Sequence, residues 1–222
     1  MVITTADGSS SIYVEELNEH YHSIHGAVQE SEHIFIKSGL FADNLKHFEQ
    51  ISILEIGFGT GLNALLTYFA ALEKQKHIHY TAIELYPLDN EVLKQLNYVQ
   101  QLPYSQADEV FSRLHRAEWE KSVQIAEHFH LCKHNISALD MHFPQEMFHL
   151  VYFDAFSPDV QPQLWTVELF EKIYNSMKIN SIFVTYSTKG IVKRGLKQVG
   201  FHIEKLQGPK GKREILRGEK QT

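Results

Sequence analysis

The stretch "LEIGFGTGLN", residues 54–63, decides the fold of this 222-residue chain. It completes an apolar run, "ISILEI", with three alternating glycines, Gly57, Gly59 and Gly61, and then enters a run with apolar positions at helical spacing. Glycine lets a backbone turn sharply and lets a ligand approach without interference from a Cβ atom. The pattern predicts a strand, a tight turn and a helix. The turn holds either a nucleotide-like ligand or nothing but a structural corner.

Strands and helices go on alternating along the rest of the chain. Further strands are predicted at "HIHYTAIEL" (77–85), "VQIAEHFHL" (123–131), "FHLVYFDAF" (148–156) and "SIFVTYS" (181–187), and at a final pair, "FHIEKLQ" (201–207) and "REILRG" (213–218). Such alternation indicates a mostly parallel sheet with helices on both faces. The last two strands flank "GPKGK", which has the residues of a hairpin turn. We therefore expect a Rossmann-like α/β fold with seven strands, the final hairpin adding an antiparallel strand.

The first part of the chain lies outside this alternation. We expect residues 1–50 to form an N-terminal extension, either a lid or a brace, that packs on a core of residues 51–222. Cys132 is the only cysteine, so no intramolecular disulfide can form, which suits a reducing compartment. The chain lacks a signal-peptide pattern and a long uncharged apolar run. We expect a cytoplasmic protein with no membrane partner.

Two carboxylates favour one ligand over another at the glycine turn. The spacing is G-x-G-x-G rather than the G-x-G-x-x-G of dinucleotide sites. Glu55, two residues before Gly57, would repel a pyrophosphate but can accept hydrogen bonds from an ammonium group. S-adenosylmethionine (SAM) has that ammonium and no phosphate. Glu84, at the end of the second strand, is placed for ribose hydroxyls, which fits NAD as well as SAM. We expect SAM, with a redox dinucleotide as the alternative.

An acid follows the apolar run of the predicted strand at residues 148–156. Asp154 is followed by Phe156 and Pro158, and Trp165 lies further along. One reading is an Asx-type turn. The other places Asp154 beside the sulfonium, where it binds an amine and accepts its proton or orients its lone pair, while Phe156 packs on the flat group that carries the amine. Trp165 is either a core anchor or a substrate-facing ring.

The motifs together resemble a known family. "GFGTGLN", "DAFSPDVQPQLWTVELF", "KGIVKRGLKQVGF" and "GKREIL" follow in the order found in the tRNA wobble-uridine methyltransferases, the methyltransferase part of the bifunctional MnmC enzymes. The fold is then similar to that of class I SAM-dependent methyltransferases. The resemblance implies methyl transfer from SAM to the amino group of 5-aminomethyl-2-thiouridine. It also implies that Asp154 lies near the target amine and that the three glycines and Glu84 line the cofactor site. Phe156, Pro158 and Trp165 are our candidate substrate-binding residues after Asp154.

The resemblance has limits. Family members often have Gly-Asp where this chain has His134 and Asn135. Asn135 can still hydrogen-bond the adenine amino group through its side-chain carbonyl. Because the chain stops soon after "KREIL", we expect the FAD-dependent oxidase half of the bifunctional form to be absent.

The net charge of −6 is unevenly distributed. From Lys189 to the end there are ten Lys and Arg against three Glu, a net charge of +7, which leaves −13 on residues 1–188. A local basic face on an acidic protein can bind nucleic acid. We expect Lys193, Arg194, Lys212 and Arg213 to hold the anticodon arm of tRNA. The alternative is a solvated Lys-rich end.

A histidine-rich strand raises the question of a metal site. His128, His130, Cys132 and His134 alternate along one strand, but neighbours on one face of a strand lie nearly 7 Å apart, too far to converge on one ion, so we expect no metal. The rival functions are a SAM-dependent methyltransferase of a small-molecule amine, an NAD-linked oxidoreductase and a non-catalytic SAM-binding module. The basic tail argues against the first, and the glycine spacing against the second.

Overall fold

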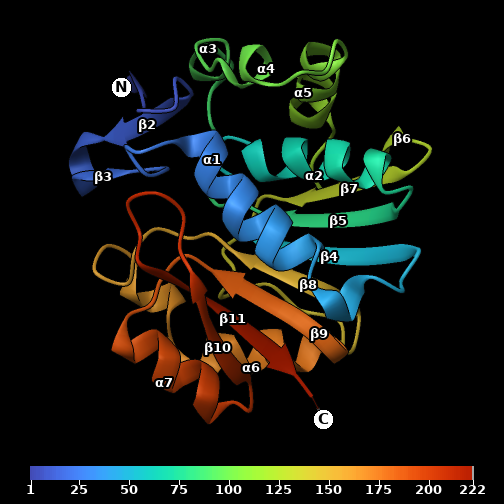
Figure 1. The fold of residues 1–222 in the computed structure, drawn as a ribbon, viewed down its shortest axis with the longest axis vertical. Coiled ribbons are helices and arrows are strands. Elements are labelled where there is room, and N and C mark those ends of the chain that lie inside the picture. The colour runs from blue at the N-terminus through green and yellow to red at the C-terminus, as the bar shows by residue number, and fades with distance from the viewer. Residues whose placement is uncertain (222) are drawn as a thin grey trace.

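The computed structural model describes residues 1–221, and within them an eight-stranded sheet runs through the molecule (Figure 1). The strand order is β10-β11-β9-β8-β4-β5-β7-β6. The strands are β4 (Gln50–Ile56), β5 (His77–Ile83), β6 (Ser122–Ala126), β7 (Phe129–His134), β8 (Phe148–Phe153), β9 (Met177–Thr185), β10 (His202–Gln207) and β11 (Glu214–Lys220). The central strands from β9 to β7 pair in parallel, while β6, β11 and β10 pair antiparallel.

The predicted α/β fold with a mostly parallel sheet and a C-terminal hairpin is confirmed. The sheet has one strand more than the seven expected. The extra strand arises in residues 123–131, which read as one strand, whereas the chain reverses between Ala126 and Phe129 and forms the antiparallel pair β6 and β7. Apolar residues continue on both sides of this short turn, so the sequence pattern does not mark it.

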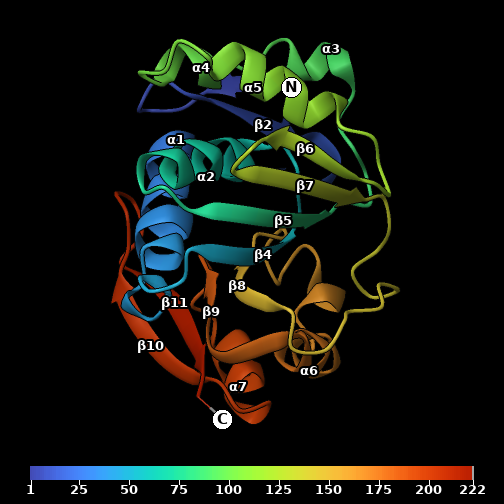
Figure 2. The same cartoon turned by 90° about the vertical axis from the view of Figure 1, so that its right-hand side faces the viewer.

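Each face of the sheet has its own hydrophobic core, because side chains alternate along a strand. On β4, Ile53 belongs to one core and Leu54 to the other. The helices are α1 (Ala27–Ser31), η2 (Glu32–Leu40), α2 (Leu62–Glu73), α3 (Asn90–Leu93), α4 (Tyr98–Gln101), α5 (Ala107–Arg116), α6 (Val167–Ser176) and α7 (Gly190–Gln198). The η2, α2 and α5 helices contribute to the first core, α6 and α7 to the second. Figure 2 shows α3, α4 and α5 at one end of the molecule and α6 and α7 at the other.

The first fifty residues form elements of their own and reach the sheet. The strands β1 (Val2–Thr4), β2 (Ser10–Val14) and β3 (Glu19–His20) make a small antiparallel sheet. The π-helical segment η2 then packs on α2, β8 and β9. The turn between β10 and β11 extends toward β3 and α1 (Figure 1). The N-terminal segment and the β10–β11 turn therefore lie together at the carboxyl ends of the central strands.

Gly57 stands where the tips of β4 and β8 come closest. Its φ is +92°, and an added Cβ would lie 2.7 Å from the carbonyl oxygen of Asp154. The backbone N–H of Asp154 donates to the carbonyl of Ile56 at 3.0 Å, so the strands remain paired up to this point. Only glycine combines this backbone conformation with this approach.

We predict that Gly57→Ala destabilises the fold more than Gly8→Ala. Gly8 has a similar φ of +88°, but its added Cβ would meet only Gln101 Oε1, at 3.6 Å. Both variants carry the backbone strain of about 1–3 kcal/mol, and only Gly57→Ala adds a clash between strands. Urea unfolding measures the difference. Equal losses would contradict the close approach of the two strand tips.

Candidate active site

A cavity of about 870 Å³ opens at the carboxyl ends of β4, β5 and β8. Strand order reverses between β4 and β8, since the chain goes from β4 outward to β5 and β7 and later from β8 outward to β9. Ligands of open α/β sheets bind at such a point. The cavity walls come from the β4–α2 turn, the ends of β5 and β8, residues 136–140, the N-terminal residues 19–25 and the β10–β11 turn.

The predicted cofactor residues Gly57, Gly59 and Glu84 line one part of this cavity. Glu84 Oε2 accepts a hydrogen bond from the Gly59 N–H at 2.9 Å, and Oε1 accepts one from the Tyr86 N–H at 2.8 Å. Burial raises the pKa of the Glu84 carboxyl. Each oxygen keeps a lone pair, so the carboxylate can still accept from a ribose diol. Gly61 is not part of the lining: it packs against His115 and shapes the turn.

Glu55 lies behind the cavity wall rather than in it. Its side chain is fully buried and is absent from the cavity lining. Asn63, on the first turn of α2, donates from Nδ2 to Glu55 Oε1 at 2.9 Å and to Asp154 Oδ2 at 2.8 Å. Burial raises the pKa of Glu55 well above its ordinary value. A direct contact between Glu55 and a ligand ammonium in the cavity, as the sequence predicted, is therefore blocked, and Asn63, which does line the cavity, stands next to Glu55 at this point.

Asp154 lines the cavity at the tip of β8, as predicted for a residue near the reacting amine. Burial raises the pKa of its carboxyl to about 7, while the hydrogen bond from Asn63 opposes that rise. The charge of Glu30 raises this pKa further and that of Lys212 lowers it. At neutral pH the group can therefore accept or release a proton.

Of the three predicted substrate residues Phe156, Pro158 and Trp165, only Phe156 lines the cavity. Its ring meets Tyr21 edge to face, with centroids 5.0 Å apart. Trp165 is 2% exposed and packs on Phe153, and its indole N–H donates to the Phe156 carbonyl at 2.8 Å. Trp165 is therefore the core anchor of the two alternatives. Pro158 is also buried and outside the cavity lining, so neither it nor Trp165 touches a ligand in the cavity.

Asn135 supports the cavity rim without lining it. Its Nδ2 donates to the carbonyls of Glu84 and Leu85, at 2.9 and 3.1 Å. The Asn135 amide nitrogen thus fixes the backbone that carries Glu84, while no hydrogen bond of the described residues engages its side-chain carbonyl. The apolar side chains Leu85, Ile136 and Ala138 line this end of the cavity and suit a flat ring. These three carry no polar motif, and sequence reasoning missed them.

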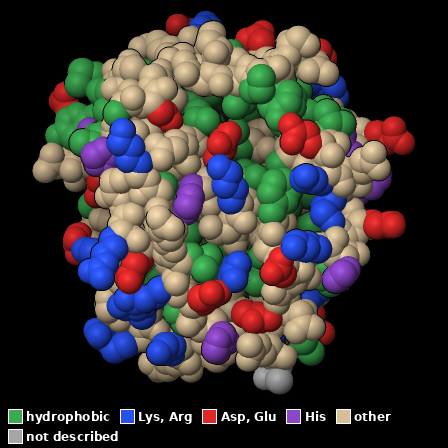
Figure 3. Space-filling model, in the orientation of Figure 1, with side chains coloured by type: hydrophobic (Ala, Val, Ile, Leu, Met, Phe, Trp, Pro, Cys, Tyr) green, Lys and Arg blue, Asp and Glu red, His purple; other side chains and the backbone are tan. Residues whose placement is uncertain are grey.

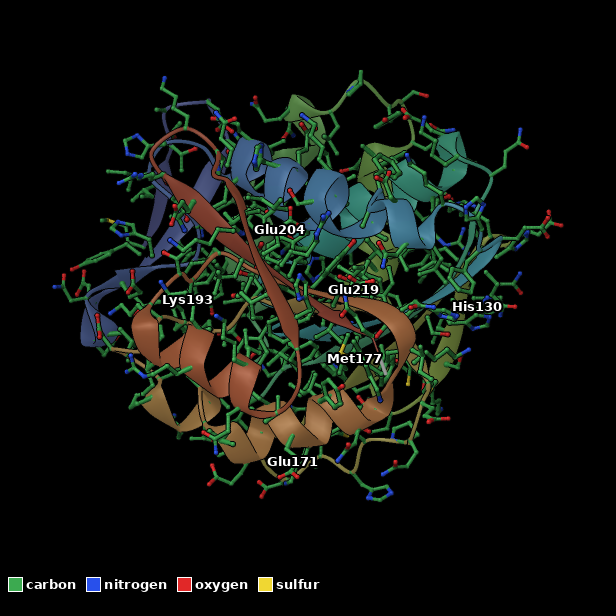
Figure 4. All side chains as sticks on the ribbon, turned by 60° about the horizontal axis from the view of Figure 1, so that its bottom comes forward. His130, Glu171, Met177, Lys193, Glu204 and Glu219 are labelled. Atoms are coloured by element: carbon green, nitrogen blue, oxygen red, sulfur yellow. The ribbon has the colours of Figure 1, made fainter. Side chains whose placement is uncertain are left out.

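The predicted basic residues divide between the cavity and the surface. Lys212 lines the cavity, 2.7 Å from Glu30 and 4.2 Å from the centroid of the Tyr186 ring. Arg213 and Arg194 are exposed and lie outside the lining. Figure 4 shows Lys193 on α7, beside the C-terminal strands.

The histidine-rich face of β7 makes local contacts. Cys132 Sγ lies 3.4 Å from His134 Nε2, and His134 Nδ1 lies 2.6 Å from Glu120. The rings of His79 and His130 stack with centroids 5.2 Å apart. Among residues 1–221, no group of three or more His, Cys, Asp or Glu side chains is placed to hold a metal ion. No helix in that same range is long and apolar enough to cross a membrane.

The sheet, the glycine turn after β4 and Glu84 after β5 define a Rossmann-like fold of the class I methyltransferase type. A family model described as "S-adenosyl-L-methionine-dependent methyltransferase" matches residues 94–221, more than half of the chain. The chain belongs to this family. The match begins after the glycine turn, so the turn supports the same conclusion independently.

Curated relatives are similar over nearly the whole chain. A protein from Marinomonas sp. (strain MWYL1), named tRNA 5-methylaminomethyl-2-thiouridine biosynthesis bifunctional protein MnmC, is 29% identical over 92% of this chain and 32% of its own length. The protein of the same name from Burkholderia mallei (strain SAVP1) is 30% identical over 90% of this chain and 32% of its own. The chain thus spans about a third of the length of these relatives.

Two solved structures confirm the fold. The crystal structure of MNMC2 from Aquifex aeolicus matches with a TM-score of 0.81 at 22% identity, over all of this chain and 70% of that one. A spermidine synthase from Thermotoga maritima matches with a TM-score of 0.55 at 12% identity, over 96% and 69%.

SAM, the methyl donor of the family, fits the residues present. Lys212 is the one Lys or Arg among the described residues that line the cavity, and Glu30 pairs with it. A dinucleotide's pyrophosphate would find no second cation here. The missing Cβ of Gly57, the Glu84 carboxylate and the apolar rim suit a sulfonium nucleoside instead.

We predict that Asp154→Asn becomes increasingly stabilising as pH rises from about 4 to 7. The pKa of Asp154 is about 7 in the fold against an ordinary value of 3.8. Between these values the unfolded chain releases the proton and the folded chain keeps it, so rising pH favours unfolding of the parent through this group by up to about 1.4 kcal/mol per unit. The asparagine does not titrate, so the variant lacks this pH-dependent loss of stability. Its advantage should reach roughly 2–4 kcal/mol and stay constant above pH 7.

Urea unfolding between pH 4 and 8 measures this dependence. Asp140→Asn is the matched control, because Asp140 is an exposed carboxyl on the rim of the same cavity. A stability difference for Asp154→Asn that does not change with pH would show that Asp154 ionises as an ordinary carboxyl.

Proposed function

We propose that this protein transfers a methyl group from SAM to the amino group of 5-aminomethyl-(2-thio)uridine at the tRNA wobble position, yielding 5-methylaminomethyl-(2-thio)uridine. The observation that carries the proposal is Asp154, a carboxyl with a pKa of about 7 at the tip of β8, facing the cavity and held by Asn63. The names of the curated relatives support the substrate. The proposed place of the reaction is the cytoplasm.

The chain's own residues supply position and proton transfer. SAM supplies an electrophilic methyl group on sulfur. The substrate amine must be neutral to attack, and Asp154 is placed to accept its proton. Asn63 fixes the Asp154 carboxyl, so the substrate amine meets a carboxyl group that is already oriented. Methyl transfer is an in-line displacement and depends mainly on such positioning.

Two aromatic rings suit the uracil base that carries the amine. Tyr21 and Phe156 both line the cavity, in edge-to-face contact with each other. Flat rings of this kind bind nucleobases by stacking. Tyr21 comes from the N-terminal segment and Phe156 lies two residues after Asp154, so separate parts of the chain combine into one aromatic wall of the cavity. Polar groups at the same end, from Gln161 and Gln163, can read the base edge.

The basic surface around α7 supports an RNA substrate over a free amine. Figure 3 shows Lys and Arg side chains gathered over the half of the molecule that holds α7 and β10, with acidic side chains among them. Lys205 and Arg217 pair with Glu214 and Glu204. Among residues 1–221, Lys193, Arg194 and Arg213 form no ion pair within 4.0 Å. The charge of Glu214 acts on Lys193 and Arg213, but that carboxylate pairs with Lys205, so the three cations can contact phosphates.

The test of the reaction uses tRNA that carries the aminomethyl uridine. Incubation with SAM should produce the methylaminomethyl nucleoside, measured by mass spectrometry after digestion to nucleosides. Asp154→Ala should lower the rate by roughly 10²-fold, the scale of a positioned proton-transfer group. Methylation of free amines but not of this tRNA would favour the small-molecule rival, and near-normal turnover by Asp154→Ala would reduce that residue to a turn former.

The test of the partner neutralises Lys193 and Arg194 together. Replacement of both by Ala should weaken tRNA binding across sequences and make its dependence on salt shallower by about one unit of slope per lost phosphate contact, while SAM affinity stays unchanged. The double variant of Lys94 and Lys121 is the matched control, because both are exposed lysines remote from α7. Equal salt slopes in parent and variant would identify the basic tail as a solvated end.

A further inference from the structure

An ion pair beside Asp154 has no part in the reaction described above. Glu30 comes from α1 and Lys212 from the turn between β10 and β11, and Lys212 Nζ lies 2.7 Å from Glu30 Oε1. The two side chains are 9% and 28% exposed. Both line the same cavity as Asp154. This ion pair therefore joins α1 to the β10–β11 turn and forms part of the cavity wall that also contains Asp154.

The pair is fixed from several directions. Glu30 Oε2 accepts a hydrogen bond from the Ser23 N–H at 2.7 Å. Lys212 Nζ lies 4.2 Å from the centre of the Tyr186 ring, whose hydroxyl donates to the Ala155 carbonyl at 2.9 Å. Ala155 follows Asp154, so the Tyr186 ring connects the ion pair to the strand tip that carries the base. Charges held this close in a partly buried site are weakly screened.

Other titratable groups that interact with Asp154 are a buried carboxyl and two phenols. Tyr21, His22 and Glu84 line the same cavity. Glu55 reaches Asp154 through Asn63, from β4. Tyr80, on β5, and Tyr186, after β9, both have a pKa raised above 10 by burial, so they carry no charge near neutral pH. Glu30 and Lys212 exert opposite charge effects on Asp154. They are therefore the groups whose removal changes its proton affinity in opposite directions.

We propose that Glu30 and Lys212 are positioning residues of the methyl transfer: their ion pair fixes the charge balance around Asp154 and thereby the proton affinity of the base. The inference rests on the proposed function. The substrate ammonium gives one proton to the Asp154 carboxylate. The nitrogen lone pair that this frees forms the bond to the methyl carbon. The sulfur–carbon bond breaks at the same time, and the electron pair of that bond stays on sulfur. The methylated amine then carries the positive charge. The C-terminal turn is thus part of the active site.

The first test compares pH profiles of the single-turnover methylation rate. In Glu30→Gln the midpoint of the rise with pH should move down, because a negative neighbour of Asp154 is lost. In Lys212→Met it should move up, because a positive neighbour is lost. Each shift should be about 0.5–1 pH unit. Lys212→Arg should restore the parent profile. Lys210→Met is the matched control, an exposed lysine on the same turn that does not line the cavity.

A second measurement needs no substrate. The side-chain amide of Asn63 donates to Asp154, so its NMR shift reports the ionisation of that carboxyl. Asp154→Asn identifies which transition belongs to Asp154, since Glu55 shares the amide. Opposite displacements of that transition in Glu30→Gln and Lys212→Met support the inference, and coincident transitions in parent and both variants overturn it. A parent that does not methylate the tRNA overturns the proposed function, and the NMR titration still decides the role of the pair.

Discussion

The side-chain amide of Asn63 is the contact on which the site depends. One nitrogen on the first turn of α2 donates both to Glu55 on β4 and to Asp154 at the tip of β8. Two buried carboxyls that share one amide would repel each other if both were ionised, and burial raises the pKa of each. The arrangement joins β4, which leads into the glycine turn, to the tip of β8, which carries Asp154, so both halves of the site share one geometry.

The N-terminal segment and the β10–β11 turn complete the cavity that the central strands begin. The N-terminal segment contributes Tyr21 and Glu30, the β10–β11 turn contributes Lys212, and all three line the cavity above Asp154. Packing at this junction is tight, since a Cβ on Gly211 would overlap the His25 ring at 1.9 Å. The segment before the sheet therefore packs against the β10–β11 turn and forms a wall of the cavity.

The sequence predicted the fold well because periodicity and glycine spacing are local signals. It located Gly57, Glu84 and Asp154 at the cavity, since each ends a strand and parallel strands end at one edge. It could not place Glu55, because whether a strand residue faces a ligand or a helix depends on which face α2 covers. Trp165 and Asn135 carry plausible chemistry, but packing and backbone hydrogen bonds engage them elsewhere. Asn63 went unnoticed because its partners lie far apart in sequence.

The most direct test of this arrangement is a crystal structure of the protein with S-adenosylhomocysteine. The ribose hydroxyls should lie about 3 Å from the Glu84 carboxylate, the adenine against Leu85 and Ile136, and the sulfur beside Gly57 with its open side toward Asp154. Asn63 should keep both of its carboxyl contacts. A ligand bound away from the β4–β8 switch point, or one whose sulfur faces away from Asp154, would contradict the assignment of the site.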